Sequence, residues 1–139
     1  MKAHHHIRLG LFLVIVATFL TAPATRADHV AAVTVIDAAQ LKKWIDGGTA
    51  MTLVDSRVAA EFKAGHIPTA VNILAATMEQ HRARLPTNKN AVLVFYCNGW
   101  PECKKSHDAA AKAVEWGYQK VYWMREGLPA WQAKGFPVE

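Results

Sequence analysis

The chain has 139 residues, of which 52% are hydrophobic and 19% charged, a composition typical of globular proteins and unlike that of disordered, collagen-like or multi-span membrane proteins. This length accommodates one domain. Three of the 16 basic residues lie in the first 27 positions, so the rest of the chain has 13 basic against 11 acidic residues. The resulting net charge of +2 gives no indication of nucleic-acid binding. Two cysteines, Cys97 and Cys103, are too few and too close in sequence for a disulfide scaffold.

Residues 1–27 have the layout of a secretory signal peptide, in which basic residues precede an apolar stretch and small residues follow it. The apolar stretch, residues 9–20, has 12 residues, whereas a helix needs roughly 20 to span a bilayer. Cleavage is expected after Ala27 or Ala24, and an uncleaved anchor is the alternative. We therefore expect an exported protein, periplasmic if the organism is bacterial, with no membrane span after cleavage and with residues 28–139 as a single domain.

The remainder of the chain alternates between strand-like and helix-like segments. Continuous apolar or β-branched runs predict strands over residues 34–36, 51–54, 70–73, 91–96 and 121–123. Helices are expected between and after them, over residues 38–45, 78–85, 106–116 and 128–134. This alternation predicts an α/β fold with a mostly parallel sheet and helices on both of its faces.

Cys97 follows directly on the most apolar strand, and nine positions later Ser106 opens a predicted helix. Cys97 therefore lies at the carboxyl edge of the sheet, where the ligand sites of open α/β folds gather. A loop that turns into a helix start presents backbone N–H groups and a partial positive charge, which favour a thiolate over a thiol. Cys97 is thus the candidate nucleophile, able to carry a persulfide or to attack an electrophilic sulfur.

Short motifs are distributed along residues 34–139 in a characteristic order. They include Asp55-Ser56-Arg57, Glu61-Phe62, Gly65-His66-Ile67-Pro68, Tyr96-Cys97 and Gly127 with Ala130-Trp131. Together these motifs resemble a single-domain rhodanese. The resemblance implies a three-layer fold with a five-stranded, mostly parallel sheet between helices. It also implies a sulfurtransferase without cofactor or metal, in which Cys97 takes a sulfane sulfur from a donor such as thiosulfate and passes it as a persulfide to a thiophilic acceptor.

The loop after Cys97 departs from the usual rhodanese pattern. The interval to Ser106 is longer than in most active members, Lys105 stands where an arginine usually precedes the serine, and Cys103 lies inside the loop. A wider loop with a point charge in place of a bidentate guanidinium fits thiosulfate less closely. In this respect the chain is similar to an exported subset of rhodanese-like proteins with a second cysteine in the active-site loop.

The loop and the helix start are expected to bind the substrate through Asn98, Gly99, Trp100, Glu102, Lys104, Lys105 and Ser106. Lys104 and Lys105 either attract an anion or are solvated surface charges. Trp100 is expected at the loop tip, where it docks a protein partner, shapes the mouth of the site or covers the cysteine.

Three residues outside the loop are expected to support the site. Asp55 and Arg57 are expected to form an ion pair beside it rather than to contact the substrate. His66 is expected to make a structural hydrogen bond, since a thiolate needs no general base.

Cys103 has three interpretations: it resolves a Cys97 persulfide or sulfenate as a disulfide, it forms a standing structural disulfide, or it has no role. The main function therefore has two alternatives, a redox protein that uses a Cys97–Cys103 disulfide and a non-turnover sulfur carrier that binds a partner through the Trp100 loop. Phosphatase or arsenate reductase chemistry is a third, disfavoured by the lack of an arginine in the loop. We expect a monomer that binds a small sulfur-containing anion or thiol and a protein sulfur acceptor.

Overall fold

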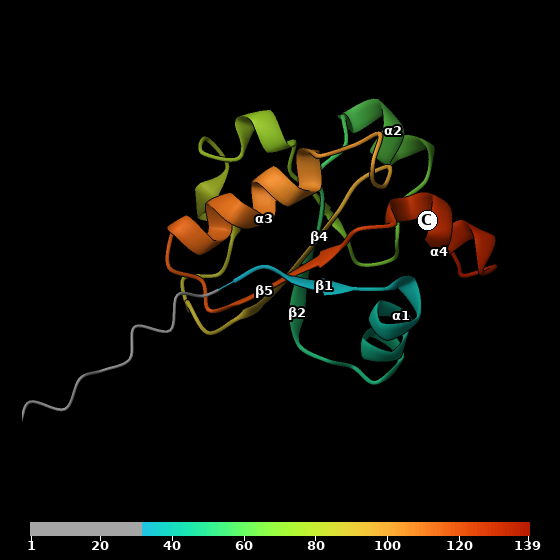
Figure 1. Ribbon diagram of the computed structural model, residues 1–139, viewed down its shortest axis with the longest axis horizontal. Coiled ribbons are helices and arrows are strands. Elements are labelled where there is room, and N and C mark those ends of the chain that lie inside the picture. The colour runs from blue at the N-terminus through green and yellow to red at the C-terminus, as the bar shows by residue number, and fades with distance from the viewer. Residues whose placement is uncertain (1–31) are drawn as a thin grey trace, which may run out of the picture.

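The computed structural model describes residues 32–139, so the expected leader over residues 1–27 lies outside the described residues. The described chain is an α/β fold with one five-stranded sheet, as predicted (Figure 1). Its elements in chain order are β1 (Thr34–Ile36), α1 (Ala38–Asp46), β2 (Met51–Asp55), α2 (Ala59–Ala64), β3 (Val71–Asn72), η1 (Ala75–Thr77), η2 (Arg82–Arg84), β4 (Val92–Tyr96), α3 (Lys105–Glu115), β5 (Lys120–Met124) and α4 (Gly127–Ala133). None of the helices from residue 32 onward is long and apolar enough to cross a membrane.

All neighbouring strands pair in parallel, in the order β1-β5-β4-β2-β3. Because every strand runs in the same direction, the carboxyl ends of β2, β4 and β5 meet at one edge of the sheet. The backbone N–H of Ser56, just after β2, donates to the carbonyl of Tyr96, the last residue of β4, at 2.9 Å. The residues that follow these three strands are therefore brought together around the end of the central strand.

Side chains of β4 alternate between the two faces of the sheet and enter two separate cores. On one face Leu93 and Phe95 pack with the buried alanines of α3. On the other face Val94 and Tyr96 pack with buried residues of α1 and α4, including Trp131. All five of these side chains have 0% exposure. The unbroken apolar run of β4 thus reflects burial on both faces, which is typical of a parallel sheet.

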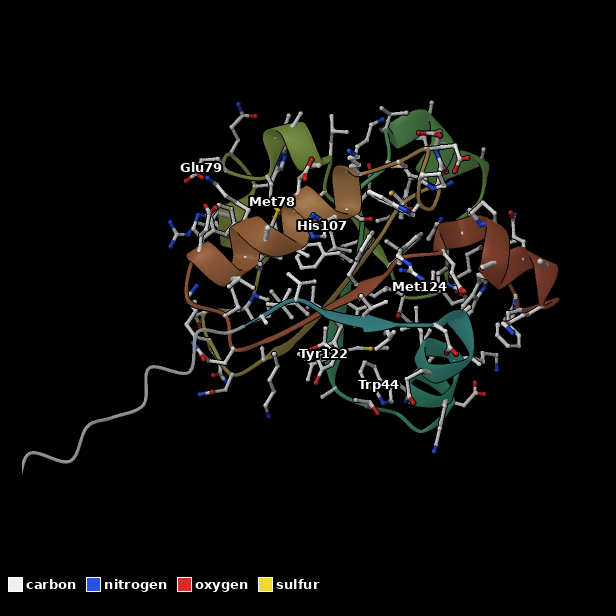
Figure 2. All side chains as sticks on the ribbon, in the orientation of Figure 1. Trp44, Met78, Glu79, His107, Tyr122 and Met124 are labelled. Carbon is white, nitrogen blue, oxygen red and sulfur yellow. The ribbon has the colours of Figure 1, made fainter. Side chains whose placement is uncertain are left out.

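Helix α1 is bounded as its sequence predicts and packs on the sheet through an aromatic pair. The side chain of Asp37 accepts a hydrogen bond from the Gln40 N–H at 2.7 Å, and Gly47 forms the other end of the helix. Trp44 meets Tyr122 of β5 edge to face, with ring centroids 4.9 Å apart (Figure 2).

Two segments differ from the predicted elements. The prediction of an α-helix over residues 78–85 was wrong, since this segment consists of turns and of η2. Only Met78 and Leu85 are buried in it, at its two ends, so no continuous apolar stripe attaches a helix to the sheet. Helix α2 was not predicted because it has six residues and none of them is buried. Its one local signal is Glu61, whose carboxylate accepts a hydrogen bond from the Val58 N–H at 3.3 Å.

The connection from β4 to α3 is attached to the start of α4 by backbone contacts. The N–H of Leu128 donates to the carbonyl of Cys97 at 2.9 Å, and the N–H of Trp100 donates to the carbonyl of Arg125 at 2.9 Å. Gly127 has a φ of +68°, and a Cβ atom at this position would overlap the backbone of Gly99. The two segments therefore approach so closely that only glycine fits between them.

We expect Gly127→Ala to destabilise the protein more than Gly48→Ala, which is a matched control. Gly48 has nearly the same φ, +66°, but no atom lies within 4 Å of its Cβ position. The left-handed backbone alone costs about 1–2 kcal/mol at both sites. At Gly127 the added Cβ would also clash with backbone that cannot move aside. Gly127→Ala should therefore lower the free energy of unfolding by about 1 kcal/mol or more beyond the control. Urea unfolding measures both changes, and equal losses would contradict the close contact.

Candidate active site

Cys97 lies directly after β4 and faces the first turn of α3. Its side chain is 1% exposed. The hydroxyl of Ser106 donates a hydrogen bond to Cys97 Sγ at 3.0 Å, and the Cys97 thiol contacts the carbonyl oxygen of Cys103 at 3.5 Å. The sulfur is therefore enclosed by polar groups between the edge of the sheet and a helix start.

A tryptophan fixes the direction of the hydrogen bond to the sulfur. Trp123 Nε1 of β5 donates to Ser106 Oγ at 2.9 Å. An indole N–H is a donor only, so the serine oxygen accepts from Trp123 and its own proton is directed to Cys97 Sγ. This arrangement stabilises negative charge on the sulfur, because the donor is already oriented. The sequence analysis placed Trp123 in the core, and at 7% exposure it is buried while also serving the site.

The loop between Cys97 and α3 is a compact turn held at both sides. The N–H of Cys103 donates to the carbonyl of Gly99 at 2.8 Å, which closes the turn. The side-chain amide of Asn98 donates to Glu61 Oε1 of α2 at 2.6 Å. This hydrogen bond is the main reason that the pKa of the Glu61 carboxyl lies below its usual value. Asn98 thus connects the cysteine loop to α2, a helix that the sequence analysis missed.

Cys103 shares the surroundings of Cys97. Burial raises the pKa of the Cys103 thiol, the neighbouring Cys97 thiol adds to the rise, and the backbone N–H groups of Asn98 and Lys105 oppose it. Two N–H groups of the expected anion cradle therefore influence Cys103. The physical reason is the length of the loop, which returns Cys103 to the start of α3 beside Cys97.

The charged loop residues lie at the surface. Glu102, Lys104 and Lys105 are exposed, and Lys105 is the first residue of α3. Lys104 Nζ lies 5.3 Å from the ring centroid of Trp100, within range of a cation–π interaction. Trp100 itself is 47% exposed, as its position at the loop tip suggested.

An aromatic pocket of about 280 Å³ lies beside the loop, lined by Trp100, His107, Trp123 and Arg125. Trp123 contacts Trp100 and His107 edge to face, with centroids 6.2 Å and 4.9 Å away, and Figure 2 labels His107 on α3. Among residues 32–139, Arg125 has no side-chain hydrogen bond or ion pair. The sequence analysis did not select Arg125; the available signal was its position directly after β5, at the carboxyl edge of the sheet.

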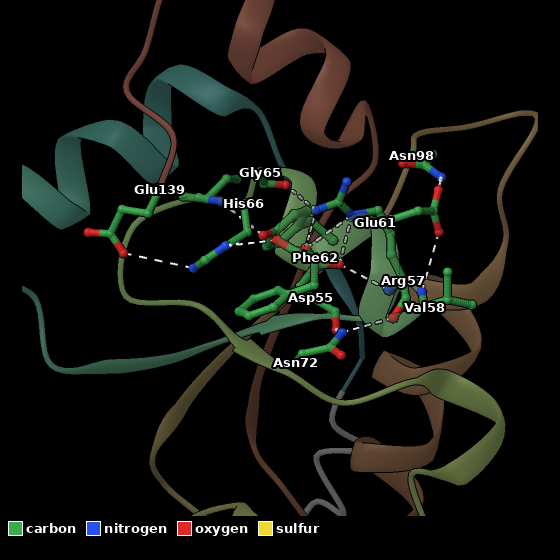
Figure 3. A network of polar contacts seen from close by, with 12 residues as sticks. Asp55, Arg57, Val58, Glu61, Phe62, Gly65, His66, Asn72, Asn98 and Glu139 are labelled. Carbon is green, nitrogen blue, oxygen red and sulfur yellow. Dashed lines mark hydrogen bonds and ion pairs between the residues drawn. The ribbon is translucent and has the colours of Figure 1, made fainter.

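Asp55 and Arg57 form a buried ion pair at the end of β2 (Figure 3). Their exposures are 0% and 4%, and Arg57 Nη2 lies 2.6 Å from Asp55 Oδ2. Arg57 also donates to the carbonyl of Gly65 at 2.7 Å, and Asn72 donates to the carbonyl of Arg57 at 2.8 Å. Burial acts to lower the pKa of Arg57, but its hydrogen bond and charge interaction with Asp55 outweigh burial and raise it. The pair fixes the turn between β2 and α2.

His66 lies at the opposite end of α2 from Asn98 (Figure 3). Its Nδ1 is 3.0 Å from the carbonyl oxygen of Phe62, and the two rings stack with centroids 3.7 Å apart. The backbone of His66 also exchanges two hydrogen bonds with Glu139. The structure therefore places His66 in a structural contact rather than beside Cys97. Within the described part of the chain, no group of three or more His, Cys, Asp or Glu residues is arranged to hold a metal ion.

Comparison with known proteins relates residues 37–134 to the family described as "Rhodanese-like domain". The chain is 28% identical over 103 residues to a "Sulfurtransferase" of Allochromatium vinosum, which covers 74% of this chain and 92% of that protein. It is 36% identical over 89 residues to the "HTH-type transcriptional regulator Rv0324" of Mycobacterium tuberculosis. That match covers 64% of this chain and only 38% of the regulator, so the chain spans less than half of the regulator's length.

Solved structures share the fold. The BH2092 protein from Bacillus halodurans superposes with a TM-score of 0.68 and 30% identity, covering 76% of each chain. A thiosulfate sulfurtransferase from Pseudomonas aeruginosa gives a TM-score of 0.67 at 18% identity, covering 77% of this chain and 20% of that one. The rhodanese-like fold expected from the sequence is thereby confirmed.

We expect Arg57→Gln to lower the free energy of unfolding by about 3–5 kcal/mol, because the carboxylate of Asp55 then stays buried without its cationic partner. Lys42→Gln is the matched control, since it breaks an ion pair with Asp46 of 2.6 Å on the surface of α1. Such a pair contributes only about 0.5 kcal/mol. Urea unfolding at neutral pH compares the two variants. If Arg57→Gln lowers the free energy of unfolding no more than the control does, the ion pair does not stabilise the turn.

Proposed function

This chain belongs to the rhodanese-like domain family, and we propose that it is an exported sulfurtransferase that carries sulfur as a persulfide on Cys97. The observation that carries the proposal is the hydrogen-bond chain from Trp123 through Ser106 to Cys97 Sγ, with distances of 2.9 and 3.0 Å. A donor aimed at the sulfur at a helix start favours the anion that must form in each step. The leader pattern of residues 1–27 supports export.

The proposed cycle has two displacement steps. The Cys97 thiolate attacks the sulfane sulfur of thiosulfate, the sulfur–sulfur bond of thiosulfate breaks, and sulfite leaves with its electron pair. Cys97 then carries one additional sulfur as a persulfide anion. An acceptor thiolate attacks this outer sulfur and leaves as a persulfide, and Cys97 returns to the thiolate. Ser106 donates its hydrogen bond to the reacting Cys97 sulfur throughout.

The position of Arg125 supports the proposal that the sulfur donor is an anion. The loop has no arginine of its own, but Arg125 brings a guanidinium to the pocket formed with Trp100, Trp123 and His107. A guanidinium holds an oxyanion through paired hydrogen bonds, which a lysine such as Lys105 cannot do. We assign Arg125 to the binding of the negatively charged end of the donor.

A second candidate function is a sulfur carrier that recognises a protein partner without turning over small donors. The 47% exposure of Trp100, beside the exposed charge of Lys104, favours it, because exposed tryptophans are common anchors of protein interfaces. In this case the domain takes up sulfur only from its protein partner.

Intact-mass analysis of the reduced mature protein tests the two candidates. Shortly after mixing with thiosulfate, or separately with a small alkyl persulfide, the wild type should gain one sulfur atom and Cys97→Ser should gain none. No gain from either donor would remove the sulfurtransferase proposal and favour the carrier. When the full chain is made in an exporting bacterium, the same spectrum shows whether the mature protein begins at Asp28 or Thr25, the two starts that export predicts.

The role of Arg125 is tested by the rate of sulfite release at varied thiosulfate concentrations. Arg125→Gln should raise KM for thiosulfate by about tenfold or more, because a charge-assisted hydrogen bond contributes about 1.5–3 kcal/mol. Lys112→Gln removes an equal charge from the surface of α3, where Lys112 pairs with Glu115 at 3.3 Å, and should leave KM unchanged. An equal effect of both variants would mean that only net charge attracts the donor.

A further inference from the structure

Cys97 and Cys103 form a pair of free thiols inside one site. Their exposures are 1% and 7%, and the Cys97 thiol contacts the carbonyl oxygen of Cys103 at 3.5 Å. The neighbouring Cys97 thiol also contributes to the raised pKa of Cys103. The turn closed by the Cys103 N–H and the Gly99 carbonyl holds them together. Sequence separation alone does not bring two cysteines into contact, so this pairing is a property of the folded loop.

The environment of Cys103 keeps its sulfur protonated until it reacts, because burial raises the pKa of this thiol. Cys103 lies two positions before the first residue of α3, an 11-residue helix whose N-cap residue, Lys104, makes no side-chain capping bond. The backbone N–H groups of Asn98 and Lys105 oppose this rise in the pKa of Cys103. Free N–H groups and the partial positive charge of a helix start stabilise an anion at this point. Cys103 therefore lies at the helix start as a thiol, beside the sulfur of Cys97 that accepts the hydrogen bond of Ser106.

We propose that Cys103 attacks the persulfide of Cys97, releases its outer sulfur as hydrosulfide and closes a Cys97–Cys103 disulfide. This inference rests on the proposed function and names the acceptor of the sulfur as a thiol of the same chain. The protein then supplies sulfide as product instead of handing a sulfane sulfur to another thiol.

The step balances in atoms and electrons. The Cys103 sulfur forms a bond to Cys97 Sγ and its thiol proton passes to the outer sulfur, the bond between Cys97 Sγ and the outer sulfur breaks, and the outer sulfur leaves with the electron pair as hydrosulfide. The sulfane sulfur is reduced by two electrons, and the two cysteine sulfurs are oxidised to the disulfide. A dithiol, either a small molecule or a protein with two neighbouring cysteines, restores both thiols by thiol–disulfide exchange and is itself oxidised to a disulfide.

A single-turnover experiment without reductant tests the proposal. Reduced protein is freed of reductant under nitrogen, mixed with thiosulfate or an alkyl persulfide, and followed by intact mass and by hydrosulfide release. In the wild type we expect transient gain of one sulfur atom, then loss of two hydrogens relative to the starting protein, with one hydrosulfide released per chain. Cys103→Ser should gain one sulfur atom, keep it and release no hydrosulfide. Cys103→Ala gives the same comparison if the serine variant does not fold.

The outcomes separate this inference from the function on which it rests. If the wild type keeps its added sulfur as long as Cys103→Ser and forms no disulfide, the relay is overturned while the persulfide at Cys97 stands. If neither the wild type nor the Cys103 variants gain sulfur from either donor, the sulfurtransferase proposal fails and the relay fails with it. Blocking free thiols with iodoacetamide after the reaction distinguishes the disulfide, which takes up no label, from the dithiol.

Discussion

The site depends on a backbone contact between Gly99 and Gly127, at which no side chain fits. This contact holds the cysteine loop against the start of α4, and the hydrogen bond from Leu128 to the carbonyl of Cys97 fixes the residue that ends β4. With its backbone fixed on one side, the loop can turn only toward α3, where Ser106 lies. The position of the sulfur is therefore determined by glycine packing, several bonds away from any reacting group.

Two sets of polar contacts at the carboxyl edge of the sheet have different roles. The ion pair of Asp55 and Arg57 is buried and fixes the turn after β2, so it stabilises the fold rather than the chemistry. The hydrogen bonds from Trp123 to Ser106 and on to Cys97 involve no charged side chain. Of the three hydrogen-bonded side chains, only that of Cys97 carries a negative charge during the proposed cycle. This suits a centre that alternates between thiolate and persulfide.

The fold could be predicted from the sequence because its central strands are buried on both faces. Such strands appear in the sequence as continuous apolar runs, such as residues 91–96. The position of Cys97 followed from the same run. Arg125 and Trp123 could not be assigned to the site, since they lie far along the chain and only the order of the parallel strands brings them to it. The contact of the Cys103 carbonyl with the Cys97 sulfur also could not be predicted, because it depends on how the extra residues of the loop turn.

The additional residues of the loop after Cys97 lie at the protein surface. Trp100, Pro101 and Glu102 are all exposed, whereas the residues at both ends of the loop, Cys97 and Ser106, are buried. Insertions here alter the mouth of the site without entering either core, so the scaffold and the recognition surface can diverge independently. One sheet can thus support a lineage of proteins that differ in partner and substrate through the sequence of a single surface turn, and the same independence makes this turn a natural place for grafting.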